Sequence, residues 1–102
     1  MAALFSVEIF TPYRKFYSAQ VEMVIINAYN GEIGILANHI PLVTVVRPGV
    51  IKIKENGKII EAALGEGFIC ISKEKTVIYV DTAEWPEEID EARALSAKER
   101  AQ

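Results

Sequence analysis

Short runs of β-branched and aromatic residues, separated by turn residues about every ten positions, are the feature that most limits how this chain folds. In the clearest example, Asn56-Gly57 separates the alternating run Val50 to Lys54 from the run Lys58 to Leu64. Asn-Gly is the dipeptide most favourable for a tight type I′ hairpin turn. Ile51 and Ile53 then point inward, and Lys52 and Lys54 point outward. Units of this kind predict an antiparallel β-sandwich or flattened barrel.

Other runs have the same character. Phe5 to Phe10 alternates and predicts a strand with one wet face. Lys15 to Ile26 predicts one long strand, or two with a bend at Ser18-Ala19-Gln20, and its four apolar residues at the end predict burial on both faces. Further strands are expected at residues 42–46, 68–71 and 76–80. The last two are apolar on both faces, so we expect the outer face to be covered by a C-terminal helix, by loops or by another protein.

The stretch from Tyr29 to Leu42 is predicted to be shaped, irregular backbone between strands. Gly31 and Gly34 free the backbone, and Pro41 fixes φ and removes a hydrogen-bond donor. Glu32 sits between the glycines as an exposed charge. Loops that are held this rigidly usually present a surface to a partner.

His39 is the only histidine, and three interpretations compete for it. It is a catalytic base, a metal ligand, or a polar group placed for packing or for a protein contact. The chain has no Gly-x-Ser-x-Gly motif, no Cys-His signature and no second histidine at ligand spacing. The pattern therefore favours a packing or interface role over catalysis or metal binding.

The length of 102 residues and the 51% apolar content suit one domain with its own core. No run approaches the roughly 20 apolar residues of a membrane-spanning helix, and the first residues lack the features of a signal peptide. We therefore expect neither membrane insertion nor secretion by that route. The single cysteine, Cys70, predicts a buried and inert thiol in a reducing compartment. The net charge of −3 gives no indication of nucleic-acid binding.

The composition changes near Asp81. Residues 1–80 contain eight basic and seven acidic side chains, whereas residues 81–102 contain three basic and seven acidic ones. This shift marks a boundary. Pro86 and the acidic residues after it suit the first turn of a helix, which we expect to run for about sixteen residues. Trp85 is predicted to anchor that helix to the sandwich.

Several motifs in order resemble the epsilon subunit of the F-type rotary ATP synthase. They are Gly31-x-x-Gly34-Ile35-Leu36-x-Asn38-His39-x-Pro41-Leu42, Pro48-Gly49-Val50, Gly67-Phe68, Asp81-Thr82-Ala83-Glu84 and Ile89-Asp90-Glu91-Ala92-Arg93-Ala94. The resemblance covers nearly all of the chain. Two departures are visible, because the family often has proline where Ala37 stands and two adjacent glycines where this chain has Gly65-Glu66-Gly67.

The resemblance implies a mainly β protein, with an antiparallel β-sandwich over residues 1–83 that binds the gamma subunit and the c ring. Residues 84–102 would form a short C-terminal α-helix, a short or truncated regulatory tail. The implied role is a non-catalytic rotor subunit in the central stalk of a proton- or sodium-translocating ATP synthase, peripheral on the cytoplasmic face of the bacterial membrane. Through its helix it would also meet the alpha and beta subunits and regulate ATP hydrolysis. The alternative that stays open is a free-standing β-sandwich module that senses nucleotides or binds proteins.

By the same resemblance, the partner interface is expected at Gly31, Glu32, Gly34, Asn38, His39 and Pro41. Glu32 would meet the loops of the c ring, and His39 would face gamma. A second set, Ile89, Asp90, Arg93 and Ala94, fits a motif that helps to bind ATP in some bacterial epsilon subunits. Because the family site also uses basic residues of a second helix, we expect ATP to be at most a weak regulatory ligand, with no metal and no other cofactor.

Overall fold

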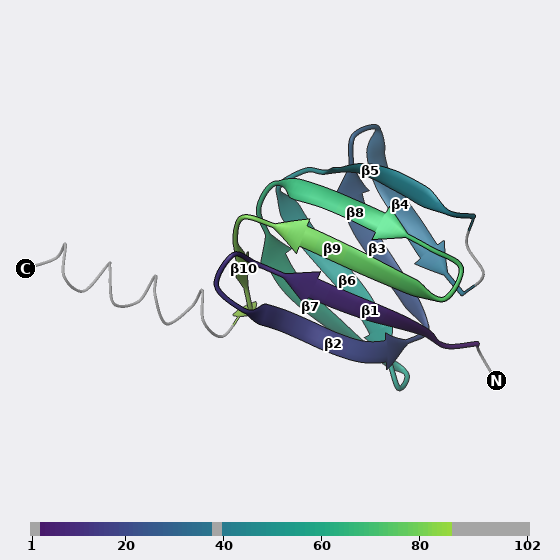
Figure 1. The fold of residues 1–102 in the computed structure, drawn as a ribbon. Helices are drawn as coiled ribbons and strands as arrows, with labels where there is room; N and C mark the ends of the chain where they lie inside the picture. The colour runs from purple at the N-terminus through teal and green to yellow at the C-terminus, as the bar shows by residue number, and fades with distance from the viewer. Residues whose placement is uncertain (1–2, 38–39, 87–102) are drawn as a thin grey trace, which may run out of the picture.

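The computed structural model describes residues 3–37 and 40–86, which form a nearly closed, barrel-like β-sandwich (Figure 1). The described strands are β1 (Phe5–Phe10), β2 (Lys15–Val21), β3 (Met23–Ala28), β4 (Gly31–Leu36), β5 (Leu42–Val46), β6 (Gly49–Glu55), β7 (Lys58–Leu64), β8 (Gly67–Ile71), β9 (Lys75–Val80) and β10 (Ala83–Glu84). The mainly β architecture is confirmed. The predicted C-terminal helix lies almost wholly in residues 87–102, outside the described residues, and stays a prediction.

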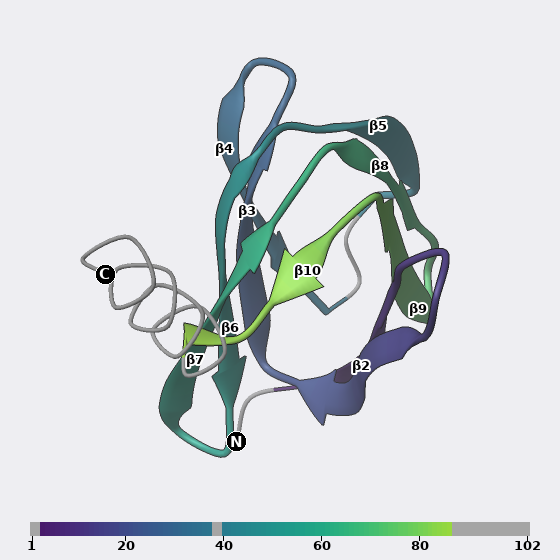
Figure 2. The same ribbon diagram turned by 90° about the vertical axis from the view of Figure 1, so that its left-hand side faces the viewer.

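The strands form two layers that face each other, with β5 crossing between them at one end (Figure 2). One layer has the order β4-β3-β6-β7-β10, and the other has the order β5-β8-β9-β1-β2. A pairing between Ala28 of β3 and Val46 of β5 joins the two layers. The prediction of antiparallel pairing holds except between β1 and β9, which pair in parallel. Parallel neighbours need a long connection, and most of the chain lies between these two strands.

Alternate side chains from both layers fill the space between them. The core residues with no exposed area are Val7, Ile9, Val21, Val24, Ile35, Val46, Ile51, Ile53, Ile69 and Ile78. All are β-branched, and such side chains pack well on a pleated surface. The predicted inward positions of Ile51 and Ile53 are thus confirmed, and Lys52 between them is exposed.

The predicted hairpin at Asn56-Gly57 is confirmed. Asn56 has a φ of 52° and Gly57 a φ of 76°, as a type I′ turn requires at both central positions. The Gly57 backbone N–H donates a hydrogen bond to Glu22 Oε1 at 3.0 Å. The strands that this turn joins, β6 and β7, pair along their whole length.

The run from Lys15 to Ile26 forms two strands, as one of the two expectations had it, but the break falls at Glu22 and not at residues 18–20. There the Glu22 N–H donates to the Lys54 carbonyl at 2.8 Å, next to the regular pairing of Met23 with Lys54. The predicted burial on both faces is wrong. Met23 and Ile25 are only half-buried, because they point to the outer face of a two-layer sandwich.

The prediction of irregular backbone from Tyr29 to Leu42 is wrong for its first half. Residues 31–36 form β4, which makes a hairpin with β3 through a turn at Tyr29 and Asn30. Ile33 and Ile35 alternate and supply the inward side chains that a strand needs. Gly31 alone in this strand has a positive φ, 112°, and Gly34 has an ordinary strand conformation.

The prediction of a buried Cys70 is also wrong, since its side chain is half-buried. Ile69 and Ile71, on either side of it, take the inward positions of β8. Cys70 therefore belongs to the outer face of its layer. The phase of a strand that is apolar on both sides cannot be read from its composition.

Candidate partner interface

The outer face of the β5–β8–β9 layer is apolar. We call it the β5–β9 face, and it consists of Phe10, Val43, Val45, Phe68, Cys70, Val77 and Tyr79, which are neighbours across four strands. Val43 is 69% exposed and Phe68 is 47% exposed. The expectation that residues 68–71 and 76–80 have a second apolar face is confirmed, and no described part of the chain covers it fully. Large exposed apolar patches mark interaction sites.

Three aromatic rings form a row across this face. The Phe68 and Tyr79 rings stack with centroids 5.0 Å apart, and the Tyr79 and Phe10 rings stack at 5.5 Å. A hollow of about 330 Å³ lies along the row, and Pro12 and Asp81 complete part of its lining. A hollow with aromatic walls can receive an apolar anchor from a partner, which is the typical energetic centre of an interface.

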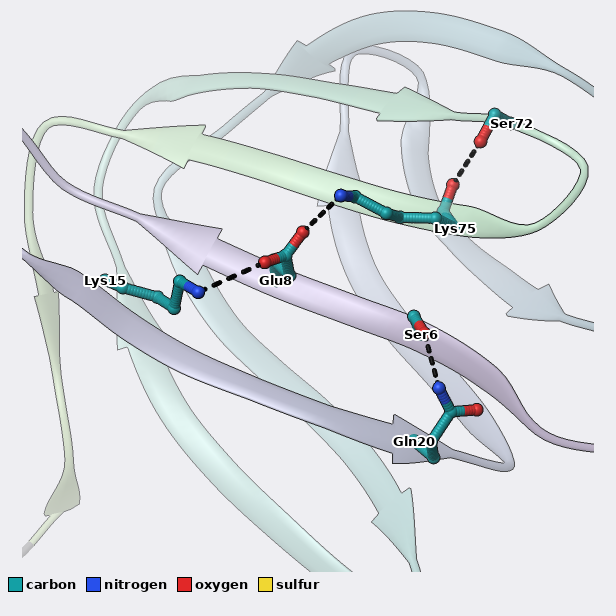
Figure 3. A network of polar contacts seen from close by, with 6 residues as sticks. All are labelled: Ser6, Glu8, Lys15, Gln20, Ser72 and Lys75. Atoms are coloured by element: carbon teal, nitrogen blue, oxygen red, sulfur yellow. Dashed lines mark hydrogen bonds and ion pairs between the residues drawn. The ribbon is translucent and has the colours of Figure 1, made fainter.

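Polar side chains on β1, β2 and β9 border the apolar part of this face (Figure 3). Glu8 Oε1 accepts a hydrogen bond from Lys75 Nζ at 2.6 Å on one side, and Glu8 Oε2 lies 3.4 Å from Lys15 Nζ on the other. Gln20 donates a hydrogen bond to the Ser6 hydroxyl beside them. An apolar centre with a polar rim is the usual arrangement of a protein–protein interface.

The electrostatics of this rim keep its central ion pair charged. The hydrogen bond from Lys75 holds the pKa of the Glu8 carboxyl below its ordinary value, while burial works against this shift and Lys15 adds to it. The same bond with Glu8 raises the pKa of the Lys75 ammonium. Lys15 also lies 5.8 Å from the centroid of the Phe10 ring, where a cation is attracted to the aromatic face.

The structure separates the interface residues expected from the sequence. Gly31 and Glu32 lie together, exposed, beside the turn between β3 and β4. Gly34 is exposed in the middle of β4, and Pro41 is exposed beyond its other end. Asn38 and His39 lie outside the described residues, so their assignments stay predictions.

The expected nucleotide-binding residues Ile89, Asp90, Arg93 and Ala94 lie outside the described residues and stay predictions. Trp85, a few residues before them, packs on the sandwich, whereas the helix that it is predicted to anchor lies outside the described residues. Its ring stacks on Phe16 with centroids 4.5 Å apart and meets the Tyr17 ring edge-on at 5.9 Å. Tyr17 in turn donates a hydrogen bond to Glu55, and burial together with this bond raises the pKa of Tyr17 above its usual range.

The described residues hold little that suggests another kind of site. They contain no group of three or more histidine, cysteine, aspartate or glutamate side chains placed to hold a metal. No described helix is long and apolar enough to span a bilayer.

Sequence reasoning had singled out neither Phe10 nor the valines of β5. The signal was present, because Leu42 to Val46 is also apolar on both faces.

Comparisons with known proteins agree with this architecture. The family described as "ATP synthase, Delta/Epsilon chain, beta-sandwich domain" matches residues 4–86. The ATP synthase epsilon chain of Alkaliphilus oremlandii is 48% identical over all of this chain and 76% of its own length. The epsilon chain of Ruminiclostridium cellulolyticum is 50% identical over 98% of this chain and 75% of its own.

Two solved structures share the fold. A chain in the cryo-EM structure of the OSCP/F1/c-ring part of Euglena gracilis mitochondrial ATP synthase superposes with a TM-score of 0.81 at 24% identity, over 99% of this chain and 65% of its own. A chain in the central stalk/c-ring structure of the Tetrahymena thermophila enzyme gives a TM-score of 0.72 at 15% identity, over 86% of this chain and 71% of its own. At these identities the likeness bears on the fold alone.

Proposed function

Because the chain belongs to the delta/epsilon chain family of ATP synthase, we propose that it is a non-catalytic central-stalk subunit that couples the gamma shaft to the c ring. The observation that carries this proposal is the β5–β9 face, which is apolar, exposed and bordered by polar groups. A stable interface buries about 800 Å² on each partner and places aromatic anchors at its centre. The row of three aromatic rings supplies such a centre.

The two proposed partners meet different parts of the molecule. The gamma subunit covers the β5–β9 face and inserts an apolar side chain into the hollow along the aromatic row. The loops of the c ring meet Gly31 and Glu32 at the β3–β4 turn, where the Glu32 carboxylate pairs with a polar or basic group. The partner interface is completed by Gly34, Asn38, His39 and Pro41. His39 makes a hydrogen bond to gamma, and this bond does not require the imidazole to change its protonation state.

A rotor subunit must pass torque without deforming. The ladders run from β10 round to β2 through both layers, and the core between the layers is fully buried. Close-packed protein interiors have low compressibility and transmit strain. A body of this kind suits coupling at the membrane surface, on the cytoplasmic face of the bacterial membrane.

Binding to the gamma subunit of the same organism tests this function. Phe68→Ser should weaken that binding by about tenfold or more, because truncating an interface anchor has effects of this size. Ile59→Ser is the matched control, since Ile59 is 54% exposed but lies on β7 in the other layer. If both variants bind gamma as the wild type does, the β5–β9 face is not the interface. If the wild type itself does not bind gamma, the proposed function is wrong.

The tail carries the regulatory part of the proposal. We infer from the resemblance that residues 84–102 meet the alpha and beta subunits and modulate ATP hydrolysis. ATP binding through Ile89, Asp90, Arg93 and Ala94 is expected to be weak, about millimolar, because one guanidinium binds a triphosphate poorly. Calorimetric titration measures this, and Arg93→Ala should abolish whatever binding is seen. A micromolar dissociation constant together with no binding to gamma would favour the free-standing nucleotide sensor instead.

A further inference from the structure

Strand β4 is an edge strand of the described sheet, because only one of its two sides pairs with a described strand. It pairs along its full length with β3, and no described strand pairs with its outer edge. Both ribbon views show β4 at the margin of its layer (Figure 1, Figure 2). A free edge presents a row of backbone N–H and C=O groups that can pair with another strand.

The register identifies which groups face outward. Ala28 and Gly31 close the two-residue turn, so their backbone groups point at each other, and the direction alternates along an antiparallel ladder. The N–H and C=O groups of Ile33 and Ile35 therefore face β3, whereas those of Glu32, Gly34 and Leu36 face the free edge. A hydrogen bond on the other side of β3 supports this assignment. Asn27 lies opposite Glu32 in the ladder, and its carbonyl points away from β4, where it accepts a hydrogen bond from the Arg47 N–H at 2.9 Å.

The terminal strands of the sheet are protected in ways that β4 is not. Strand β10 has only two residues. Strand β2 begins with Lys15, has a register shift in its pairing with β1, and carries the Trp85 ring against Phe16. Strand β4 has six residues, no lysine, no proline and no register shift. Short length, lysine, bulges and cover are the usual devices that prevent unwanted pairing at an edge.

We propose that the outer edge of β4 accepts an extended strand from the gamma subunit. This inference rests on the proposed function. The incoming strand places an apolar residue beside Leu36, which is 57% exposed, and it leaves the Glu32 side chain, next to the β3–β4 turn, to the loops of the c ring. Between them, a Cβ at Gly34 would meet no atom within 4 Å, so a large side chain of the incoming strand can lie across this position.

The occupant is a strand of gamma and not a second copy of this chain. Antiparallel pairing of two β4 strands about Gly34 would place each Glu32 beside the Leu36 of the other copy. It would also bury far less than the roughly 800 Å² per partner of a stable interface. A strand from a subunit that is already bound through the β5–β9 face needs no such area, because tethering gives it a high effective concentration.

Amide hydrogen exchange tests the proposal on the full chain, free and in its purified complex with gamma and the c ring. In the free chain, the amides of Glu32, Gly34 and Leu36 should exchange fast, while those of Ile33 and Ile35 are protected. In the complex, the three fast amides should slow by about tenfold or more. A complex in which they stay fast overturns this inference and leaves the proposed function standing. If no complex forms, both fail. Slowing that grows with the concentration of the free chain would assign the edge to a second copy and overturn the proposal.

A pair of variants at one position separates the backbone from the side chain. Gly34→Pro removes an N–H that faces the free edge and leaves the ladder with β3 intact. Gly34→Ala keeps that N–H and adds a methyl group in open space. Gly34→Pro should weaken incorporation into the complex by about tenfold relative to Gly34→Ala, with the fold of each checked by its melting point. Equal incorporation of the two folded variants would overturn the proposal, and the exchange measurement on the wild type decides it if Gly34→Pro does not fold.

Discussion

At the scale of single residues, Glu8 connects three strands, because it lies on β1 and contacts Lys15 of β2 and Lys75 of β9. The pKa of Glu8 is lowered in the folded chain, so its contribution to stability is present above the unfolded value of about 4.3 and is lost as the pH falls through the folded value. The pKa of Lys75 is raised, so its contribution is present below about 10.4 and is lost as the pH rises through the folded value.

We therefore expect Glu8→Gln to lower the melting temperature at pH 7, with a difference from the wild type that shrinks as the pH falls below about 4. Thermal melts from acid to neutral pH measure this. Glu74→Gln is the control, because Glu74 is exposed in the turn between β8 and β9. A Glu8→Gln difference that stays constant at all pH values would show that the ion pair does not cause it.

Inward and outward positions were predictable where polar and apolar residues alternate. Lys52 and Lys54 alternate with Ile51 and Ile53, so the phase of β6 was clear from the sequence. Cys70 lies in a strand with apolar residues on both phases, and there local pattern gives no phase. The neighbours across the sheet decide it, and they come from distant parts of the chain.

At the scale of elements, the β6–β7 turn depends on a glycine at positive φ. Gly57→Ala should destabilise the fold by about 1 kcal/mol, because a side chain at a φ of 76° is strained. Gly34→Ala is the matched control, since Gly34 lies in an ordinary strand conformation with open space around its Cβ position. Urea unfolding measures both variants. Equal midpoints would show that the turn tolerates a side chain.

The junction with the tail is held by Trp85. A chain that ends at Pro86 should keep the stability of the described sandwich, whereas a chain that ends at Glu84 should lose about 1–3 kcal/mol with the ring that stacks on Phe16. Urea unfolding of the two truncated chains measures the difference. The predicted boundary after residue 83 is tested by the same pair, and equal stability would place Trp85 outside the folding unit.

Most strands were predictable because turn residues separate runs of β-branched side chains. β4 was missed because its two glycines indicate irregular backbone, while the alternation of Ile33 and Ile35 indicates a strand. Pairing with β3 decided between the two signals, and such tertiary contacts often override local preference. The break at Glu22 was misplaced because nothing in Lys15 to Ile26 marks where the chain passes from one layer to the other.

At the scale of the whole molecule, the interface assignments predict a loss of coupling without a loss of folding. The double variant Glu32→Ala, His39→Ala should change the free energy of unfolding by less than about 0.5 kcal/mol, because Glu32 is exposed, His39 is predicted to be exposed, and surface substitutions have small effects. The ATP-driven ion pumping of the assembled complex should fall. Melting curves and a pumping assay measure the two effects. Normal assembly and pumping would contradict the interface assignment.

A second apolar face on β8 and β9 was predictable from composition. The full extent of this face was not predictable, because Phe10 joins it through the parallel pairing of β1 with β9, and no local sequence pattern indicates that pairing. The expected sites at residues 38–39 and 89–94 lie outside the described residues. The fold was therefore more predictable than the candidate site, since strands follow from local alternation and faces follow from long-range pairing.

The parallel pairing of β1 with β9 also bears on how the chain folds as it is made. Ser6 of β1 pairs with Lys75 of β9. β1 therefore lacks this neighbour until most of the chain has left the ribosome. The β6–β7 hairpin can form early, because its contacts are local. Closure of the sandwich comes last, and contacts between residues so far apart in sequence make folding slow. Until then the nascent chain exposes unpaired strands, the condition in which chains aggregate and chaperones act.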